Sequence, residues 1–245
     1  KAIEPRLGVG GDMQESVIIE NDGLYEEVEF PPERKLSDVS GKEIIEIIKE
    51  AGIVGMGGAG FPTHVKYMPK DPSAIDHIIV NCAECEPYLT SDYRRMLEEP
   101  EKIVGGLQAA MKIFGGKVKG VLAVEDNKKD AATKLREAAK GIPDIEVVEL
   151  KTKYPQGAER QLIFAVTGRQ INSSMLPADA GCVVNNCDTI HAIYEAVHFG
   201  RPVMKKVMTI TGNAIKEPQN LRVRTGTNFR ELIEEAGGFT SEPEK

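Results

Sequence analysis

The sequence lacks tryptophan, has only four cysteines in 245 residues, and contains fewer basic than acidic side chains, which gives a formal net charge of −7. So few cysteines argue against a secreted scaffold held by disulfides. The acidic balance argues against a general nucleic-acid binder, which needs a basic face. No apolar run approaches the roughly 18–20 residues that span a bilayer, and no charged-then-apolar leader opens the chain. We therefore expect a soluble, intracellular globular protein.

Short apolar strands alternate with amphipathic helices through the middle of the chain. Strands are expected at 75–81, 118–126, 145–151 and 181–186, and each is followed by a helical pattern. A helix that opens at Ser40, with Glu43 as its capping-box partner, precedes them. Because this alternation is typical of a parallel sheet, we predict an α/β fold with a mostly parallel, Rossmann-like sheet and helices on both faces.

The two ends of the chain have a different pattern. Residues 1–35 are expected to hold one or two strands and a Pro-Pro linker, and residues 36–200 to form the α/β domain. Residues 201–245 contain two strands at hairpin spacing followed by a helix, which predicts a small separate module. The chain starts at Lys1 without Met and ends soon after a helix-like stretch, so we interpret it as a fragment of something longer.

The most unusual stretch is GIVGMGGAGFPTHVK at 52–66, which contains the glycines Gly55, Gly57, Gly58 and Gly60. Their spacing matches G-x-G-x-x-G, but a dinucleotide turn needs a strand before it, and here a helix precedes the loop. Glycines still permit positive φ, and successive N–H groups can form an anion nest. We expect Pro62 to begin a helix whose N-terminal end favours an anion, with Lys66 as the countercharge. A ligand site is favoured over a flexible hinge.

Polar side chains follow several predicted strands. The candidates are Asn81, Glu84 and Glu86 after the first strand, Tyr154, Gly157, Glu159 and Arg160 after the third, and Asn185 and Asn186 at the end of the fourth. In an open parallel sheet, ligands bind beyond the carboxyl ends of the strands. Amide side chains both donate and accept hydrogen bonds, which suits a heterocyclic or hydroxyl-rich ligand. The sequence therefore predicts a ligand site at this sheet edge, beside the glycine loop.

Four motifs in order carry a resemblance to a known family: GMGGAGFPTHVK, NCAECEPYLTSDYRRMLEEP, YPQGAERQLI and VNNCDTIHAIYEAV. Together they resemble the RnfC family, the NADH-oxidising peripheral subunits of Rnf electron transport complexes (ferredoxin:NAD⁺ oxidoreductases). They are also similar to the FMN-binding subunit of respiratory complex I. Residues 2–23 resemble the tail of the family's N-terminal barrel-sandwich region, and residues 207–238 resemble the opening of its β-grasp module of SLBB type.

The resemblance implies noncovalently bound FMN with NADH stacked on it, and hydride transfer from NADH to FMN, from which single electrons leave. By match to the motifs, the four glycines and Lys66 would surround the flavin and its phosphate. The flavin ring or ribityl chain would be held by Asn81, Asn185 and Asn186. Because the cofactor carries this chemistry, no protein nucleophile is required.

The resemblance also assigns residues to the NADH side. Phe61 would stack near the nicotinamide or adenine, and Tyr154 and Gly157 would shape the wall. The side facing NADH would carry Glu84, Glu86 and Glu159. Glu159 would repel a 2′-phosphate, so NADH is expected over NADPH. Ala83 and Ala158 stand where the complex I pattern has acidic residues, and these departures fit the Rnf branch of the resemblance.

Partners and further cofactors follow from the resemblance alone. The full-length family carries two C-x2-C-x2-C-x3-C-P runs for [4Fe–4S] clusters, and none occurs in this sequence. Electrons would therefore leave for clusters outside this chain. A peripheral position on the cytoplasmic side of the cell membrane is implied, with other Rnf subunits as partners, ferredoxin as an indirect one, and no nucleic acid.

Two other functions stay open at this point. One is a ligand-binding or docking subunit without flavin, related to the sodium-pumping NADH:quinone reductase. The other is an RnfC-like reductase that serves proline reductase or cobalamin. The intact glycine loop favours flavin binding over the first, and the sequence does not decide the second.

The cysteines, the histidines and one arginine pair show no specific pattern of a metal, catalytic or nucleotide site. The cysteines Cys82, Cys85, Cys182 and Cys187 could supply four metal ligands, but their spacing favours free thiols. The histidines show no ligand or catalytic spacing. Arg94 and Arg95 could contact the NADH pyrophosphate, although a solvated helix start is favoured.

Overall fold

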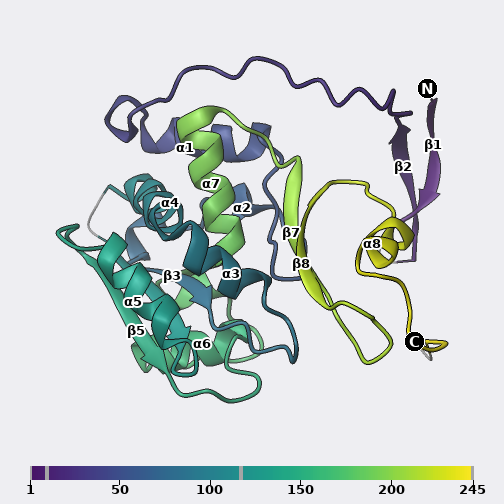
Figure 1. Ribbon diagram of the computed structural model, residues 1–245. Helices are drawn as coiled ribbons and strands as arrows, with labels where there is room; N and C mark the ends of the chain where they lie inside the picture. The colour runs from purple at the N-terminus through teal and green to yellow at the C-terminus, as the bar shows by residue number, and fades with distance from the viewer. Residues whose placement is uncertain (1, 9–10, 116–117, 244–245) are drawn as a thin grey trace. The chain divides into compact units, whose positions relative to one another are not determined.

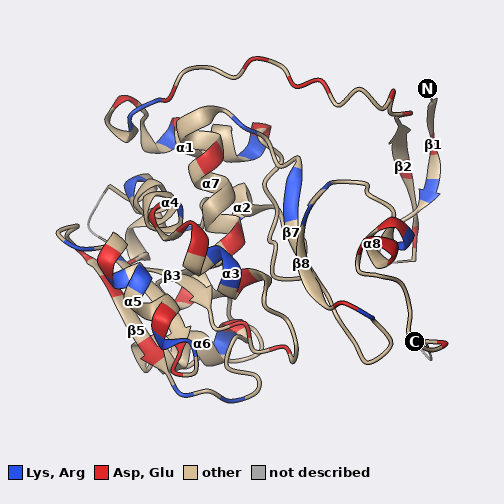
Figure 2. Ribbon diagram, in the orientation of Figure 1, with Lys and Arg blue, Asp and Glu red and all other residues tan. Residues whose placement is uncertain are grey.

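The computed structural model describes residues 2–8, 11–115 and 118–243, so residues 1 and 9–10 of the predicted first region and 244–245 of the last lie outside the described residues. The chain divides into two compact units, Lys1–Phe30 and Pro31–Lys245. The first unit contains an antiparallel hairpin of β1 (Ala2–Leu7) and β2 (Met13–Ile18). The stretch after β2 is acidic, as Figure 2 shows, with Glu20, Asp22, Glu26, Glu27 and Glu29.

The second unit is built on a four-stranded parallel sheet (Figure 1). Its strands are β3 (His77–Cys82), β4 (Lys119–Glu125), β5 (Ile145–Leu150) and β6 (Cys182–Asn186). The strand order is β5-β4-β3-β6, and every neighbouring pair is parallel. The predicted fold class is confirmed, and each strand lies within two residues of its predicted bounds.

Helices cover both faces of this sheet. Successive strand residues point to opposite faces, and apolar residues on both faces are buried under helices. Ile78 and Leu122 face the larger hydrophobic core, whereas Ile79 and Val121 face a smaller one. The larger core is completed by α1 (Gly41–Glu50), α3 (Ser91–Glu98), α4 (Pro100–Ile113), α5 (Lys129–Ala138) and α7 (Cys187–Phe199). The smaller core lies under α6 (Glu159–Thr167).

The remaining elements are short. They are the single turn α2 (Thr63–Lys66), the antiparallel hairpin of β7 (Lys205–Ile210) and β8 (Gln219–Arg224), the helix α8 (Phe229–Glu235), and 3₁₀ turns at Leu36–Asp38, Pro72–Ala74 and Pro177–Ala180. A hairpin followed by a helix is the predicted pattern after residue 200. Among the described helices, none is long and apolar enough to cross a membrane.

Several helix ends lie where the sequence signals place them. Ser40 and Glu43 form both hydrogen bonds of a capping box at the start of α1. Gly168 and Gly200 end α6 and α7 in the left-handed conformation, which glycine adopts without steric cost. Pro100 separates α3 from α4 by opening the second helix. Local chemistry therefore fixes these boundaries.

A close helix contact fixes the position of α7. At Gly106 of α4, an added Cβ would lie 2.0 Å from the carbonyl oxygen of Ile190 in α7. Only glycine allows the two backbones to approach so closely. This contact holds the first turns of α7 against α4, and some of the polar residues described below lie on these first turns.

Candidate functional site

The glycine loop, defined here as residues 51–62, connects α1 to α2 and is closed by its own hydrogen bonds. The Gly55 N–H donates to the Phe61 carbonyl at 2.8 Å, and the Gly60 N–H donates to the Gly55 carbonyl at 3.2 Å. The loop is tied to α7 because the Met56 N–H donates to Thr189 Oγ1 at 2.9 Å. These bonds make the loop a defined turn and not a loose connection.

The crest of the glycine loop, defined as residues 57–60, contains backbone N–H groups that donate to no acceptor among the described residues. Gly58 and Gly60 have φ of +122° and +61°, and a Cβ added at either would meet nothing within 4 Å. Within the described part of the chain, the N–H groups of Gly57, Gly58 and Ala59 have no protein acceptor. Backbone donors in this arrangement attract an anion or a polar heterocycle. The loop can therefore hold such a ligand.

The helix expected to supply an anion site after Pro62 is too short to do so. α2 spans four residues, and Pro62 is its N-cap. A single turn has almost no aligned peptide dipoles to sum, so that part of the prediction is wrong. Lys66 is not a free countercharge either, since its Nζ donates to the Val184 carbonyl at 2.8 Å and to Glu159 at 3.2 Å.

Asn81 connects the end of β3 to the loop after β5. Its Nδ2 donates to the Gly157 carbonyl at 2.8 Å, and its Oδ1 accepts from the Ala83 N–H at 3.1 Å. An added Cβ at Gly157 would lie 3.2 Å from Cys85 Sγ and 3.4 Å from Asn81, so glycine permits this close approach. The predicted convergence of these two loops is present.

The asparagine pair at the end of β6 has two separate surroundings. Asn185 is buried, and its Nδ2 donates to the hydroxyl of Tyr67 at 2.8 Å. Asn186 is the N-cap of α7, and its Nδ2 donates to Asp92 Oδ2 at 2.6 Å. Gly57 packs on Asn186, whose Cβ would lie 3.3 Å from a Cβ added there. Asn186 therefore lies against the glycine loop, as predicted.

The acidic residues after β3 are partly engaged by the protein itself. Glu84 accepts from the N–H groups of Asp92 at 2.8 Å and Tyr93 at 3.1 Å, so it caps the start of α3. Burial raises the pKa of Glu84 despite these bonds. Glu86 is exposed and accepts from the Tyr154 hydroxyl at 3.3 Å. The predicted roles of both carboxylates beside NADH stay predictions.

Two aromatic side chains of the predicted site remain available for stacking. Phe61 is 46% exposed, and Tyr154 is 68% exposed. Phe61 directly follows the glycines of the loop, and an exposed ring there suits a flat ligand, because aromatic faces stack on heterocycles. The predicted stacking residue Phe61 and the predicted wall residue Tyr154 are therefore accessible, and their contacts with a ligand stay predictions.

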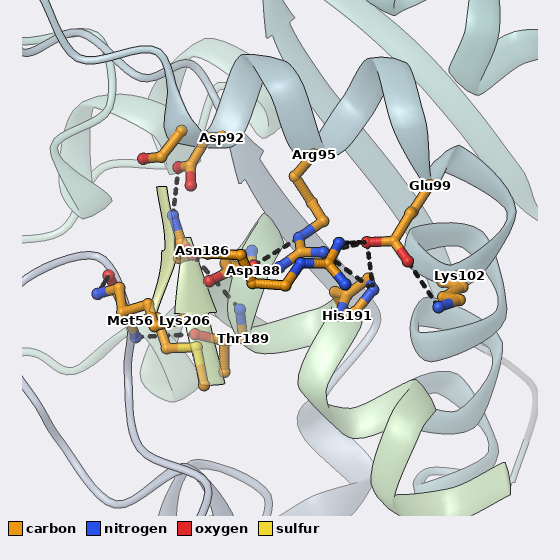
Figure 3. Close-up of polar contacts among 12 residues, drawn as sticks. Met56, Asp92, Arg95, Glu99, Lys102, Asn186, Asp188, Thr189, His191 and Lys206 are labelled. Carbon is orange, nitrogen blue, oxygen red and sulfur yellow. Dashed lines mark hydrogen bonds and ion pairs between the residues drawn. The ribbon is translucent and has the colours of Figure 1, made fainter. Parts of the chain in front are cut away.

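A buried ion-pair network beside the site was not expected from the sequence. Arg95 is 7% exposed, with its Nε 2.8 Å from Asp188 Oδ1 and its Nη1 bonded to Glu99. Figure 3 shows these contacts continuing from Arg95 to Glu99, His191 and Lys102. A solvated helix start is therefore wrong for Arg95. Helical spacing could have indicated the Arg95–Glu99 pair, which is four residues apart, but not its burial, because Arg94 and Glu98 have the same spacing and are about half exposed.

A metal site is not indicated by this network or by the cysteines. Glu99, His191 and Glu195 bring three possible ligand atoms within 4.8 Å of one another. Lys102 already bridges the two carboxylates, at 2.6 Å from Glu99 and 2.8 Å from Glu195. Among the described residues, no three cysteine thiols gather in this way.

Asp92 provides a pH-dependent prediction. Burial, and then the charges of Glu84 and Asp188, raise the pKa of Asp92 from 3.8 to about 7. The folded chain therefore keeps a proton that the unfolded chain releases above about pH 4, and stability is lost as the pH rises from there to about 7. Asp92→Asn should remove this loss, so its unfolding free energy relative to wild type should rise between pH 4 and 7.

Urea unfolding at each pH measures this difference. Asp126→Asn is the matched control, because hydrogen bonds from Thr152 lower the pKa of Asp126 and its stabilisation is lost in acid instead. A difference between Asp92→Asn and wild type that stays constant across this range would contradict the assignment.

Comparison with known proteins identifies the fold. The Nuo51 FMN-binding domain family (Complex1_51K) matches residues 48–195, which contain the glycine loop, the sheet and the asparagine pair. The chain belongs to this family. The SLBB domain family matches residues 207–245, where the β7–β8 hairpin and α8 lie.

Relatives of this Nuo51-type chain have names that agree with the motif resemblance. It is 50% identical over 232 residues to a subunit of the proton-translocating ferredoxin:NAD(+) oxidoreductase complex of Clostridium ljungdahlii, covering 94% of this chain and 50% of the relative. It is 47% identical over 245 residues to the corresponding subunit of the Na(+)-translocating complex of Acetobacterium woodii, covering 100% and 55%. The resemblance to the RnfC family is confirmed, and the chain spans about half the length of these relatives.

A solved structure shows the same fold. The NAD⁺-reducing [NiFe]-hydrogenase in the H₂-reduced state superposes with a TM-score of 0.70 at 22% identity, covering 84% of this chain and 41% of that one. At this identity the likeness concerns the fold alone.

The residues present fit the FMN that the family implies. The glycine loop provides the three unused N–H donors described above and open space at Gly58 and Gly60, where a side chain would fill the cradle. Asn186 forms an adjoining wall, and exposed Phe61 offers a stacking face. This donor set, polar but rich in backbone amides, suits a flat anionic cofactor.

Proposed function

We propose that this chain binds FMN at the glycine loop and oxidises NADH there, as part of an RnfC-type subunit of a ferredoxin:NAD⁺ oxidoreductase complex. The observation that carries the proposal is the set of unused N–H donors of Gly57, Gly58 and Ala59 beside Asn186. The names of the relatives and the family match support it. When bound, the flavin would accept a hydride and release single electrons.

The chain's own residues would bind and orient. The loop N–H groups would hold the cofactor's polar edge and phosphate, and Asn81 and Asn186, fixed by Gly157 and Asp92, would contact its ring or ribityl chain. Asn185 would act from behind, because its amide is engaged by buried Tyr67. Phe61 and Tyr154 would cover the nucleotide and exclude water from the reacting face.

The proposed location and electron-transfer partners of the chain are based on the names of its relatives and on the motif resemblance. We propose a peripheral subunit on the cytoplasmic face of a membrane, passing electrons to [4Fe–4S] clusters outside this chain and exchanging them with ferredoxin through other subunits. The two relatives translocate different ions by name, protons and sodium. No coupling ion is therefore proposed.

Flavin binding is tested by titrating the purified chain with FMN while the flavin fluorescence is recorded, with riboflavin as the matched ligand control. Because the loop donors attract the phosphate, FMN should bind more tightly than riboflavin by about tenfold or more. Anaerobic addition of NADH should then bleach the flavin absorbance. A folded chain that binds no FMN at micromolar concentration would favour a docking role instead.

Nicotinamide preference is measured in the same assay. Glu159 lies at the start of α6 with 41% of its side chain exposed. Its negative charge, only partly offset by Lys66 at 3.2 Å, would repel a 2′-phosphate. NADH should therefore bleach the flavin faster than NADPH, and equal rates would contradict this role of Glu159.

A further inference from the structure

The C-terminal hairpin contacts both loops that border the candidate site. Thr209 of β7 accepts from the Thr90 N–H at 3.1 Å, and Asn220 of β8 bonds to the Thr90 hydroxyl at 3.1 Å, in the loop that follows β3. Lys206 of β7 reaches the glycine loop, where its Nζ donates to the Met56 carbonyl at 3.0 Å. A single hairpin thus holds two walls of the site.

Both backbone polar groups of Met56 are hydrogen-bonded to other elements of the fold. The Met56 N–H is held by Thr189 Oγ1 at 2.9 Å, and the Met56 carbonyl by Lys206. Figure 3 shows Met56, Thr189 and Lys206 gathered beside Asn186. The peptide units before and after Met56 are therefore anchored from two different elements, α7 and β7.

Anchoring the Met56 carbonyl also directs the next N–H group. The peptide bond is planar and trans, so the Met56 C=O and the Gly57 N–H lie in one plane and point in opposite directions. The Gly57 N–H has no protein acceptor within the described portion of the chain. A cation on the carbonyl oxygen also polarises the peptide unit, which strengthens the N–H as a donor.

We propose that Lys206 is a positioning residue of the flavin site, which acts through the Met56 carbonyl to fix the direction and strength of the Gly57 N–H donor. The hairpin matched by the SLBB family is then part of the flavin site and not a separate appendage. That the ligand is a flavin rests on the proposed function. That Lys206 holds the glycine loop in place does not depend on the ligand. Figure 2 shows Lys205 and Lys206 as the basic start of β7.

The test compares Lys206→Met with Lys206→Arg and with Lys134→Met, which removes an exposed lysine on α5, outside both the glycine loop and the C-terminal hairpin. Hydrogen–deuterium exchange of the ligand-free chain is followed for peptides covering residues 52–62. Lys206→Met should raise the rate of amide hydrogen exchange in these peptides by about tenfold. Lys206→Arg keeps a cation and should keep the exchange slow, and Lys134→Met should exchange at the wild-type rate. Urea unfolding checks that all variants are folded.

The second readout is FMN affinity, measured by fluorescence titration. Lys206→Met should weaken FMN binding by about tenfold, with rescue by arginine. Unchanged exchange in the glycine loop of Lys206→Met would overturn the proposal. If wild type binds no FMN but the loop exchange responds, the proposed function fails while the bracing role of Lys206 is supported. If wild type binds FMN and Lys206→Met binds it equally well, the positioning role is overturned.

Discussion

Replacing Arg95 by methionine should lower the free energy of unfolding by about 3–5 kcal/mol, because it leaves the buried carboxylate of Asp188 without its cation, whereas Glu99 keeps Lys102. Arg95 is 7% exposed and contacts Asp188 at 2.8 Å as well as Glu99. Methionine keeps much of the side-chain volume, so the loss reports the charge and not a cavity. Urea unfolding monitored by circular dichroism measures the effect.

The neighbouring residue supplies the control. Arg94 also pairs with a glutamate one turn along the helix, Glu98, but both side chains are about half exposed. An exposed pair of this kind contributes about 0–1 kcal/mol, so Arg94→Met should change stability little. Equal effects of the two substitutions would show that Arg95 does not carry a buried network.

Replacing Gly60 by leucine should weaken FMN binding by about ten- to hundredfold, since a side chain would occupy the cradle where the cofactor is proposed to lie. Gly60 has φ +61°, and an added Cβ there meets no protein atom within 4 Å. The backbone cost of a non-glycine residue in this conformation is about 1–2 kcal/mol. Fluorescence titration gives the affinity, and urea unfolding gives the stability.

Gly52→Leu is the matched control for this substitution. Gly52 has φ +66° and equally open surroundings, but it lies just after α1 and outside the crest of the loop. Both variants should lose similar stability, and only Gly60→Leu should lose FMN affinity. Equal affinities for the two variants would place the flavin elsewhere.

The positions of some candidate-site residues could be predicted from the sequence, and those of others could not, for physical reasons. Asn81 and Asn186 could be predicted because the ends of parallel strands meet at one edge, and they are register partners across β3 and β6. The burial of Asn185 against Tyr67 could not, since neighbouring residues in a chain carry no signal of which one faces the core at a strand–helix junction. Glu84 likewise caps a helix that begins seven residues later.

Local signals in the sequence determined the α/β class, the strand positions, the capping of α1, the stops at Gly168 and Gly200, and the glycine loop as the element proposed to bind a ligand, because each depends on residues close together in the chain. Tertiary structure alone decided that Arg95 is buried, that Lys66 is paired with Glu159, and that Lys206 reaches Met56 across 150 positions. Such contacts depend on how α3, α7 and the C-terminal hairpin pack, and packing brings together charges whose separation along the chain carries no pattern.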